Sequence, residues 1–110
     1  MKRLTKNKQR VLLDLLEVAP EGLIAPVLGD SAGIAPGSLY PALYDLVAVG
    51  LLESQWIEAE SGRAAKEYTV TPNGVLLAKE IKAGRIAGTG WRKYLPAPAS
   101  LGEMGLARLI

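Results

Sequence analysis

At 110 residues, the chain has the usual length of one domain and leaves little room for a second core. Hydrophobic residues make up 49% of the chain and charged residues 22%, a balance typical of a folded protein and unlike that of a disordered one. No apolar run approaches the roughly 20 residues that a membrane-spanning helix needs, and the basic residues 1–10 lead into an amphipathic pattern. We therefore expect a folded cytoplasmic protein that is neither secreted nor inserted in a membrane.

Several kinds of catalytic site are excluded by composition. The chain contains no cysteine, which rules out disulfides and thiolate metal sites, and no histidine, the commonest general base and transition-metal ligand. Gly84, Gly88 and Gly90 match neither of the glycine patterns that bind nucleotide phosphates. We expect no enzymatic activity, no metal and no cofactor.

The formal net charge of +2 conceals a strong separation of charge along the chain. Five cations crowd the first ten residues, namely Lys2, Arg3, Lys6, Lys8 and Arg10. From Val11 to Glu60 every charged residue is acidic, and basic residues return at Arg63 and Lys66 and again between residues 79 and 93. A polyanion would meet the N-terminal arm, the Arg63 region or the C-terminal part first, although each cluster could equally be an ordinary solvated face.

Hydrophobic spacing predicts a first helix from about Thr5, as its N-cap, to about Val18, ended by Ala19 and Pro20. A short second helix is predicted over residues 21–28, followed by a connector over residues 29–35 that is rich in turn-forming residues.

The third predicted helix begins with Pro36 and ends before Gly50. The residues that fall on its inward face are Leu39, Leu43, Leu46 and Val47. The other side carries Tyr40, Tyr44 and Asp45, so this helix has an outward face with an unusual number of tyrosines. Pro41 lies in its second turn, and local rules alone do not explain a proline there.

The residues after Gly50 predict a hairpin and a fourth helix. A strand over residues 51–58 places Leu52, Ser54 and Trp56 on an inward face, with Trp56 expected in the core. Residues 59–65 form the turn, residues 66–70 form the second strand, and a helix runs from Pro72 to about residue 83. The predicted fold class is mainly α with a small β-hairpin.

We divide the chain into residues 1–84 and a C-terminal segment, residues 85–110, which is rich in glycine and proline. This segment carries too many apolar residues to remain exposed to solvent, namely Trp91, Tyr94, Leu95, Leu101, Met104, Leu106, Leu109 and Ile110. These residues could pack against the domain's own core or against a partner subunit, so the segment is a candidate for dimerisation.

The order of these elements, three helices, a hairpin and a further helix, is that of a winged helix-turn-helix domain. The motif that identifies it is Gly37-Ser38-Leu39-Tyr40-Pro41-Ala42-Leu43, then Leu46, Gly50-Leu51-Leu52, Gly62-Arg63, Tyr68 and Thr71-Pro72-Asn73-Gly74. This pattern closely resembles the signature of PadR-like transcriptional regulators, which includes the awkward proline of the third helix. The resemblance covers about residues 12–83. The chain departs from it at Ala35, where a Ser or Thr N-cap is usual.

The resemblance implies a homodimer, expected to be a repressor, that places the third helix in the major groove of double-stranded DNA while the wing touches the backbone. Ser38, Tyr40 and Tyr44 become candidate contacts from the recognition helix. Gly62 and Arg63 mark the wing tip, and Lys66 is placed to reach a neighbouring phosphate. The four lysines and arginines at the start of the chain, Lys2, Arg3, Lys6 and Lys8, are candidate phosphate contacts.

Alternatives remain open at this stage. The two tyrosines could be half-buried rings packed on the hairpin, and Arg63 could be a solvated turn residue. A small-molecule effector is left open, because the sequence names none. As a whole, the domain could instead be a protein-interaction or assembly module whose acidic surface, residues 11–60, binds another protein and reads no DNA sequence.

Overall fold

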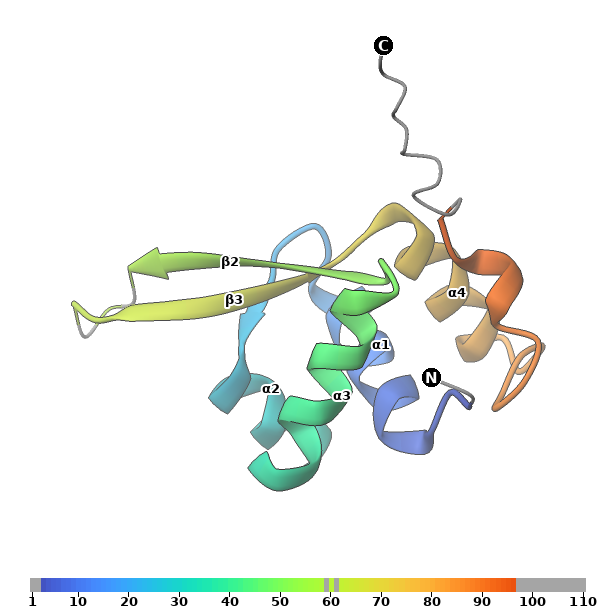
Figure 1. The fold of residues 1–110 in the computed structure, drawn as a ribbon, viewed down its shortest axis with the longest axis horizontal. Coiled ribbons are helices and arrows are strands. Elements are labelled where there is room, and N and C mark those ends of the chain that lie inside the picture. Colours follow the sequence, from blue (N-terminus) through green and yellow to red (C-terminus); the bar gives the residue numbers. More distant parts are fainter. Residues whose placement is uncertain (1–2, 59, 61, 97–110) are drawn as a thin grey trace, which may run out of the picture.

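A computed structural model describes residues 3–58, 60 and 62–96. In this part of the chain a small antiparallel sheet adjoins a group of helices, and the hairpin extends beyond them as a wing (Figure 1). The elements in chain order are α1 (Lys6–Val18), β1 (Leu23–Ile24), α2 (Ala25–Ala32), α3 (Pro36–Ala48), β2 (Leu52–Glu58), β3 (Ala64–Val70), α4 (Pro72–Lys82) and the 3-10 helix η1 (Arg92–Tyr94). The winged helix-turn-helix fold predicted from the sequence is confirmed.

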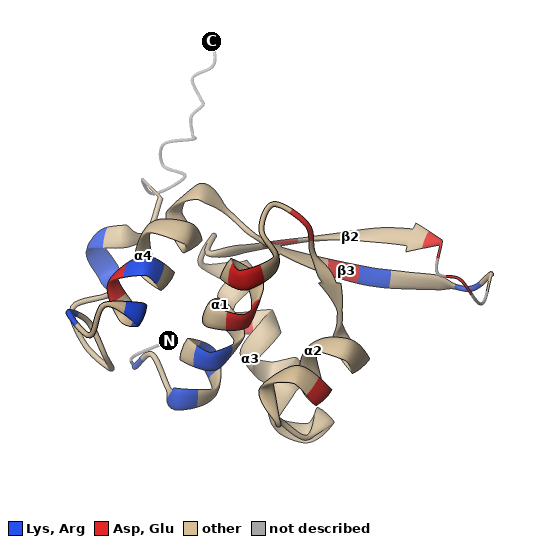
Figure 2. Cartoon of the chain, turned by 180° about the vertical axis from the view of Figure 1, so that it is seen from behind, with Lys and Arg blue, Asp and Glu red and all other residues tan. Residues whose placement is uncertain are grey.

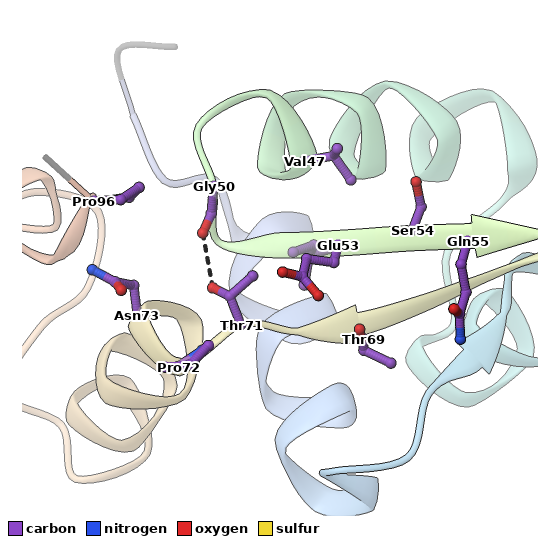
Figure 3. A pocket seen from close by; sticks show the side chains of 11 residues that line it. Val47, Gly50, Glu53, Ser54, Gln55, Thr69, Thr71, Pro72, Asn73 and Pro96 are labelled. Carbon is purple, nitrogen blue, oxygen red and sulfur yellow. Dashed lines mark hydrogen bonds between the residues drawn. The ribbon is translucent and has the colours of Figure 1, made fainter. Parts of the chain in front are cut away.

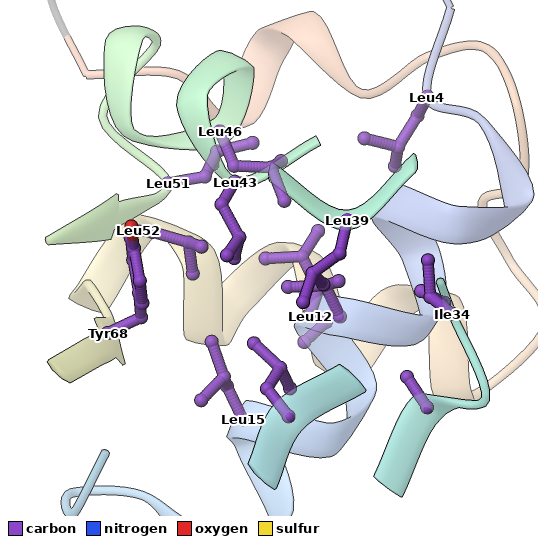
Figure 4. Close-up of a cluster of buried hydrophobic side chains, with 14 of the residues drawn as sticks. Leu4, Leu12, Leu15, Ile34, Leu39, Leu43, Leu46, Leu51, Leu52 and Tyr68 are labelled. Atoms are coloured by element: carbon purple, nitrogen blue, oxygen red, sulfur yellow. The ribbon is translucent and has the colours of Figure 1, made fainter. Parts of the chain in front are cut away.

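Leucines from α1, α2, α3, β2 and α4 form most of the core, part of which is shown in Figure 4. The apolar stripes of α1 and α3 supply its centre, with Leu12 and Leu43 both 0% exposed. Complete burial of one such side chain stabilises a fold by about 1.5–3 kcal/mol. The core therefore fixes which side of each helix remains in solvent.

Threonine side chains cap two helices, as predicted. The Oγ1 atom of Thr5 accepts a hydrogen bond from the backbone N–H of Lys8 at 3.3 Å. The Oγ1 atom of Thr71 accepts from the N–H of Gly74 at 3.0 Å and donates to the carbonyl oxygen of Gly50 at 2.8 Å. Thr71 thus joins the end of α3 to the start of α4.

The prediction of the second helix was wrong in its limits. The helix spans Ala25–Ala32, so most of the predicted connector is helical, and the preceding residues Leu23 and Ile24 form a short strand paired with β3. Pro26 explains the shift, because a proline is tolerated in the first turn of a helix but disrupts its interior. Gly33, with φ of +70°, ends the helix in a left-handed conformation.

The inward placement of Trp56 was also wrong, and β3 begins at Ala64, two residues earlier than predicted. The pairs Leu52 with Val70, Ser54 with Tyr68 and Trp56 with Lys66 lie on one face of the hairpin. Leu52 and Tyr68 are buried, whereas Trp56 is 69% exposed. The prediction therefore assigned the inward-facing positions of the strand correctly. At Trp56, however, the hairpin already extends beyond the helices that cover its inward face.

The described part of the C-terminal segment packs onto the helices. Trp91 is 1% exposed and belongs to the core, and the backbone N–H of Leu4 donates to the carbonyl oxygen of Gly88 at 3.3 Å. The side chain of Asn73 donates to the carbonyl oxygen of Tyr94 at 2.8 Å. Residues 85–96 thus cover the domain's own core, while residues 97–110, with their predicted role in dimerisation, lie outside the described residues.

Where the structure describes the chain, none of its helices has the length and apolar character needed to cross a bilayer.

Two glycines near helix starts give a stability prediction. A Cβ atom at Gly74 would clash with the carbonyl oxygen of Leu51 and with Cγ2 of Val70, whereas a Cβ atom at Gly37 meets open space. Gly74→Ala should lower the free energy of unfolding by about 1–3 kcal/mol because buried backbone must move. The control Gly37→Ala should raise it by about 0.4–1 kcal/mol by restricting the unfolded chain. Urea unfolding followed by circular dichroism measures both, and equal stabilities of the two variants would contradict this packing.

Candidate nucleic-acid interface

The outward face of α3 carries Ser38, Tyr40 and Tyr44, all exposed. Burial of Leu39, Leu43 and Leu46 sets the rotation of the helix about its axis, so the tyrosines, one turn apart, project together into solvent. Tyr44 is 76% exposed and Tyr40 51% exposed. The predicted outward face is confirmed, and the alternative of a half-buried ring does not hold for Tyr44.

The proline of α3 is accommodated at the surface. Pro41 lies within α3 and has no N–H to donate to the carbonyl oxygen of Gly37, four residues earlier. Both residues are exposed, so water can hydrate that carbonyl group. The structure thus supplies the explanation that local sequence rules lacked.

Beside α3, the inner face of the wing carries an aromatic ring and a cation. The Nζ atom of Lys66 lies 5.3 Å from the centroid of the Trp56 ring, a cation–π distance. The opposite face of the hairpin carries the acidic Glu67. The carboxylate of Glu67 accepts a hydrogen bond there from the amide of Gln55 at 3.1 Å. At the wing tip, Gly62 has φ of +83° and Arg63 is exposed.

A groove separates α3 from the inner face of the wing. It consists of two adjoining hollows of about 380 and 470 Å³, and Tyr40, Lys66 and Tyr68 line both. Tyr44 lines the first hollow and Trp56 the second. Burial, and secondarily the nearby Tyr40, raises the pKa of Tyr68 above its usual value, which further favours the neutral hydroxyl. We call this surface the α3–wing groove.

Lys8, a predicted phosphate contact, is not a free cation of the N-terminal arm in the structure. Its Nζ atom lies 3.0 Å from the Oδ2 atom of Asp45, and its side chain is only 10% exposed. The ion pair joins α1 to α3 and neutralises the single carboxylate of α3. Helix α1 begins at Lys6, so Lys8 lies inside this helix, and its side chain contributes to packing against α3.

The remaining cations predicted near the N-terminus lie away from the wing. Figure 2 shows the described Lys and Arg residues gathered mainly around the start of α1, α4 and the segment after it. Arg3 and Lys6 belong to this group and are exposed, whereas Lys2 lies outside the described residues. The structure thus brings three predicted residues together at the groove, namely Tyr40, Tyr44 and Lys66. Ser38 is exposed on α3, and Gly62 and Arg63 lie at the wing tip, outside the lining of the groove.

Ion pairs reduce the free positive charge around α4. Arg85 binds Glu80 at 2.8 Å, a hydrogen bond that holds the pKa of this carboxyl below its usual value. Lys82 lies 3.6 Å from Glu17 of α1. Both pairs are largely exposed and contribute little to stability.

A third and larger hollow, of about 670 Å³, lies where α3, β2 and α4 meet (Figure 3). Glu53, Gln55 and Asn73 line it together with Pro96 and the Thr71 that binds Gly50. A carboxylate in the lining repels phosphate, so this hollow is a poor nucleic-acid site despite its size.

Trp56 is the residue of the groove that sequence reasoning placed in the core and the structure places at the surface. A signal for its exposure was present, because Glu58 occupies the next position on the same face of the strand. A charged residue there indicates that the core has ended. Only the distance between the hairpin and the helices, which is a tertiary property, decides whether Trp56 lies before or beyond that limit.

The Lys8–Asp45 pair generates a prediction. Asp45→Ala leaves the ammonium group of Lys8 almost buried without its partner and should lower the free energy of unfolding by about 1–3 kcal/mol. Lys8→Met should cost less, since the side chain of Asp45 is 42% exposed and water can hydrate it. Asp30→Ala, at an exposed position of α2, serves as the control and should change stability by less than about 0.5 kcal/mol. Urea unfolding tests all three, and a stability of Asp45→Ala equal to that of Asp30→Ala would refute the role of the pair.

Solved structures of several transcriptional regulators resemble this fold. A PadR-like transcription factor from Bacteroides fragilis is 26% identical, with a TM-score of 0.53, and the match covers 67% of this chain and 77% of that one. A variant of Lactococcus lactis ZitR is 22% identical with a TM-score of 0.61, and covers 72% of this chain. NadR in complex with 4-hydroxyphenylacetate is 24% identical, also with a TM-score of 0.61 and 72% coverage. This chain spans about half the length of the last two, at 51% and 53%.

Curated protein sequences gave no significant match. Residues 21–80, in contrast, match the profile of the transcriptional regulator PadR-like family. This region is more than half of the chain and contains α2, α3, the wing and most of α4. The chain therefore belongs to the PadR-like family of transcriptional regulators.

Proposed function

We propose that the protein is a sequence-specific DNA-binding regulator that acts in the cytoplasm as a homodimer and represses transcription. The observation that carries this proposal is the exposed Ser38–Tyr40–Tyr44 face of α3, set beside a wing that carries Lys66, in a chain of the PadR-like family. A dimer bound across promoter DNA would block access to it, so repression is the expected direction.

The shape of α3 suits the major groove. A helix is about 10–12 Å wide with its side chains, and the major groove of B-DNA is about 12 Å wide. Ser38 lies in the first turn of α3, so it would reach deepest, and the hydroxyl groups of Tyr40 and Tyr44 would contact phosphates or base edges along the groove wall. In this arrangement sequence selectivity rests on uncharged donors and acceptors.

Attraction to the DNA backbone must then come from outside the recognition helix, because α3 contains no lysine or arginine. Arg63 and Lys66 of the wing are the nearest candidates, and Arg3 and Lys6 could add to them. Each neutralised phosphate contributes about −0.9 to the slope of log affinity against log salt. Wing contacts alone predict a slope of about −4 for a dimer, and wing plus N-terminal contacts predict about −7.

The dimer contact is expected on the side of α4, which lies at the far end of the molecule from the wing (Figure 1). Leu76 of α4 is 56% exposed and offers an apolar contact there. Two recognition helices related by a two-fold axis would reach successive major grooves about 34 Å apart.

A protein-interaction module is the second candidate, and the charge distribution favours it. Acidic residues mark the later part of α1, α2 and the hairpin in Figure 2. Such a surface attracts a basic protein and repels DNA.

Selection from a random duplex pool at about 150 mM salt, near physiological ionic strength, tests the proposal. We expect enrichment of a two-fold symmetric motif. Tyr44→Ala should weaken binding to that motif by roughly ten- to thirtyfold, through the loss of about 1 kcal/mol per protomer, and should affect unrelated duplexes little. No enrichment by folded protein would favour the second candidate.

The N-terminal cations need a separate test that preserves the fold. Deleting residues 1–8 would remove Leu4, which is 1% exposed in the core, so substitution is preferable to deletion. Arg3→Gln with Lys6→Gln should weaken binding to all duplexes alike and reduce the salt slope by about 3–4 if both residues contact phosphate in each protomer. An unchanged slope would restrict the backbone contacts to the wing.

A further inference from the structure

We propose that Trp56 contacts DNA from the wing: its indole ring packs against the deoxyribose of the strand that runs through the α3–wing groove, while Lys66, over the same ring, binds a phosphate of that strand. The inference rests on the DNA binding proposed above and assigns a residue that the sequence had placed in the core.

The exposure of Trp56 is the first observation. The chain has two tryptophans, and one of them, Trp91, is 1% exposed, whereas Trp56 is 69% exposed. An indole ring that remains in water does not gain the large favourable free energy of burying its apolar surface. Tyr40 and Trp56 line one hollow, so the exposed ring belongs to a continuous aromatic surface rather than standing alone.

The geometry of the groove then indicates which occupant suits this surface. If α3 lies in a major groove, the strand that bounds it passes along one side of the helix, and the wing lies beyond that strand over the minor groove. The α3–wing groove lies between those two elements: Tyr44 lines one of its hollows, and Trp56 lines the other, which also borders Ile24, Ala25 and Pro26 at the start of α2. An extended sugar–phosphate chain offers an apolar sugar face to the indole and an anion to the cation beside it.

The charge on the wing supports the same occupant. Lys66 lies 5.3 Å from the centre of the Trp56 ring, and within the described ranges no carboxylate lies at salt-bridge distance from it. Glu67, its neighbour in the chain, projects to the other face and binds Gln55. Among the described residues Lys66 is therefore held over the ring without a salt-bridge partner, although Glu58 occupies the same face of the hairpin two residues after Trp56. Its placement reduces the ordering needed when a phosphate arrives.

Single-tryptophan fluorescence tests the contact in the full-length chain. In Trp91→Phe the emission reports on Trp56 alone, and in Trp56→Phe it reports on Trp91. Addition of the selected duplex should quench Trp56 and reduce its acrylamide quenching constant by about twofold or more, as burial against a sugar requires, while Trp91 should not respond. If Trp91→Phe does not fold, the difference between wild-type and Trp56→Phe emission gives the same signal.

Affinity measurements separate the two parts of the contact. Trp56→Ala should weaken binding to all duplexes by about tenfold with little change in salt slope, and Trp56→Tyr should restore most of the loss. Lys66→Gln should reduce the salt slope by about 1.8 for a dimer. The matched control is Ile57→Ala, on the opposite face of the same strand, which should leave affinity unchanged.

Two results would overturn the inference, and they are distinguishable. If fluorescence anisotropy of labelled DNA shows wild-type binding while Trp56 emission and the affinity of Trp56→Ala are unchanged, the contact is absent and the proposed function stands. If the folded wild-type protein binds no duplex at all, the proposed function fails and the contact fails with it.

Discussion

Burial of one leucine stripe of α3 is the constraint on which the candidate interface depends. Leu39, Leu43 and Leu46 enter the core at helical spacing, which leaves no freedom in the rotation of the helix about its axis. Tyr40 and Tyr44 face solvent as a consequence of that packing, without a specific interaction that holds them outward. A change in the core of α3 would therefore alter the proposed DNA contacts through geometry, even where no residue proposed to make such a contact is changed.

In the wing, too, burial of one face decides which residues are exposed, but the pattern repeats every two residues, as in any strand, and not at helical spacing. Along β2, alternate residues face the body, and their burial falls from Leu52 to Trp56 as the hairpin leaves the helices behind. The same face of β2 thus contributes Leu52 to the core and Trp56 to the surface. The transition at the Ser54–Tyr68 pair is also where the α3–wing groove begins, so the end of the core defines the start of the interface.

The helices, their caps and the hairpin could be predicted from the sequence because local rules determine them. Thr5 and Thr71 were identified as caps from their side chains and positions alone, and both make the expected hydrogen bonds. Apart from the limits of α2, which Pro26 sets locally, the features that escaped prediction are tertiary. Pairing of β1 with β3, the partnership of Lys8 with Asp45 and the exposure of Trp56 each depend on how far apart two elements lie, which no periodicity encodes.

The charge distribution suggests how affinity and selectivity could be divided in such a protein. Helix α3 carries no cation and its single carboxylate is paired with Lys8, so it would offer DNA no long-range attraction and little repulsion. Approach would then depend on cations elsewhere, while discrimination depends on short-range hydroxyl and ring contacts that form only when the duplex fits. Because these contacts are uncharged, salt would weaken cognate and unrelated duplexes by similar factors. Selectivity between them should therefore change less with ionic strength than affinity does.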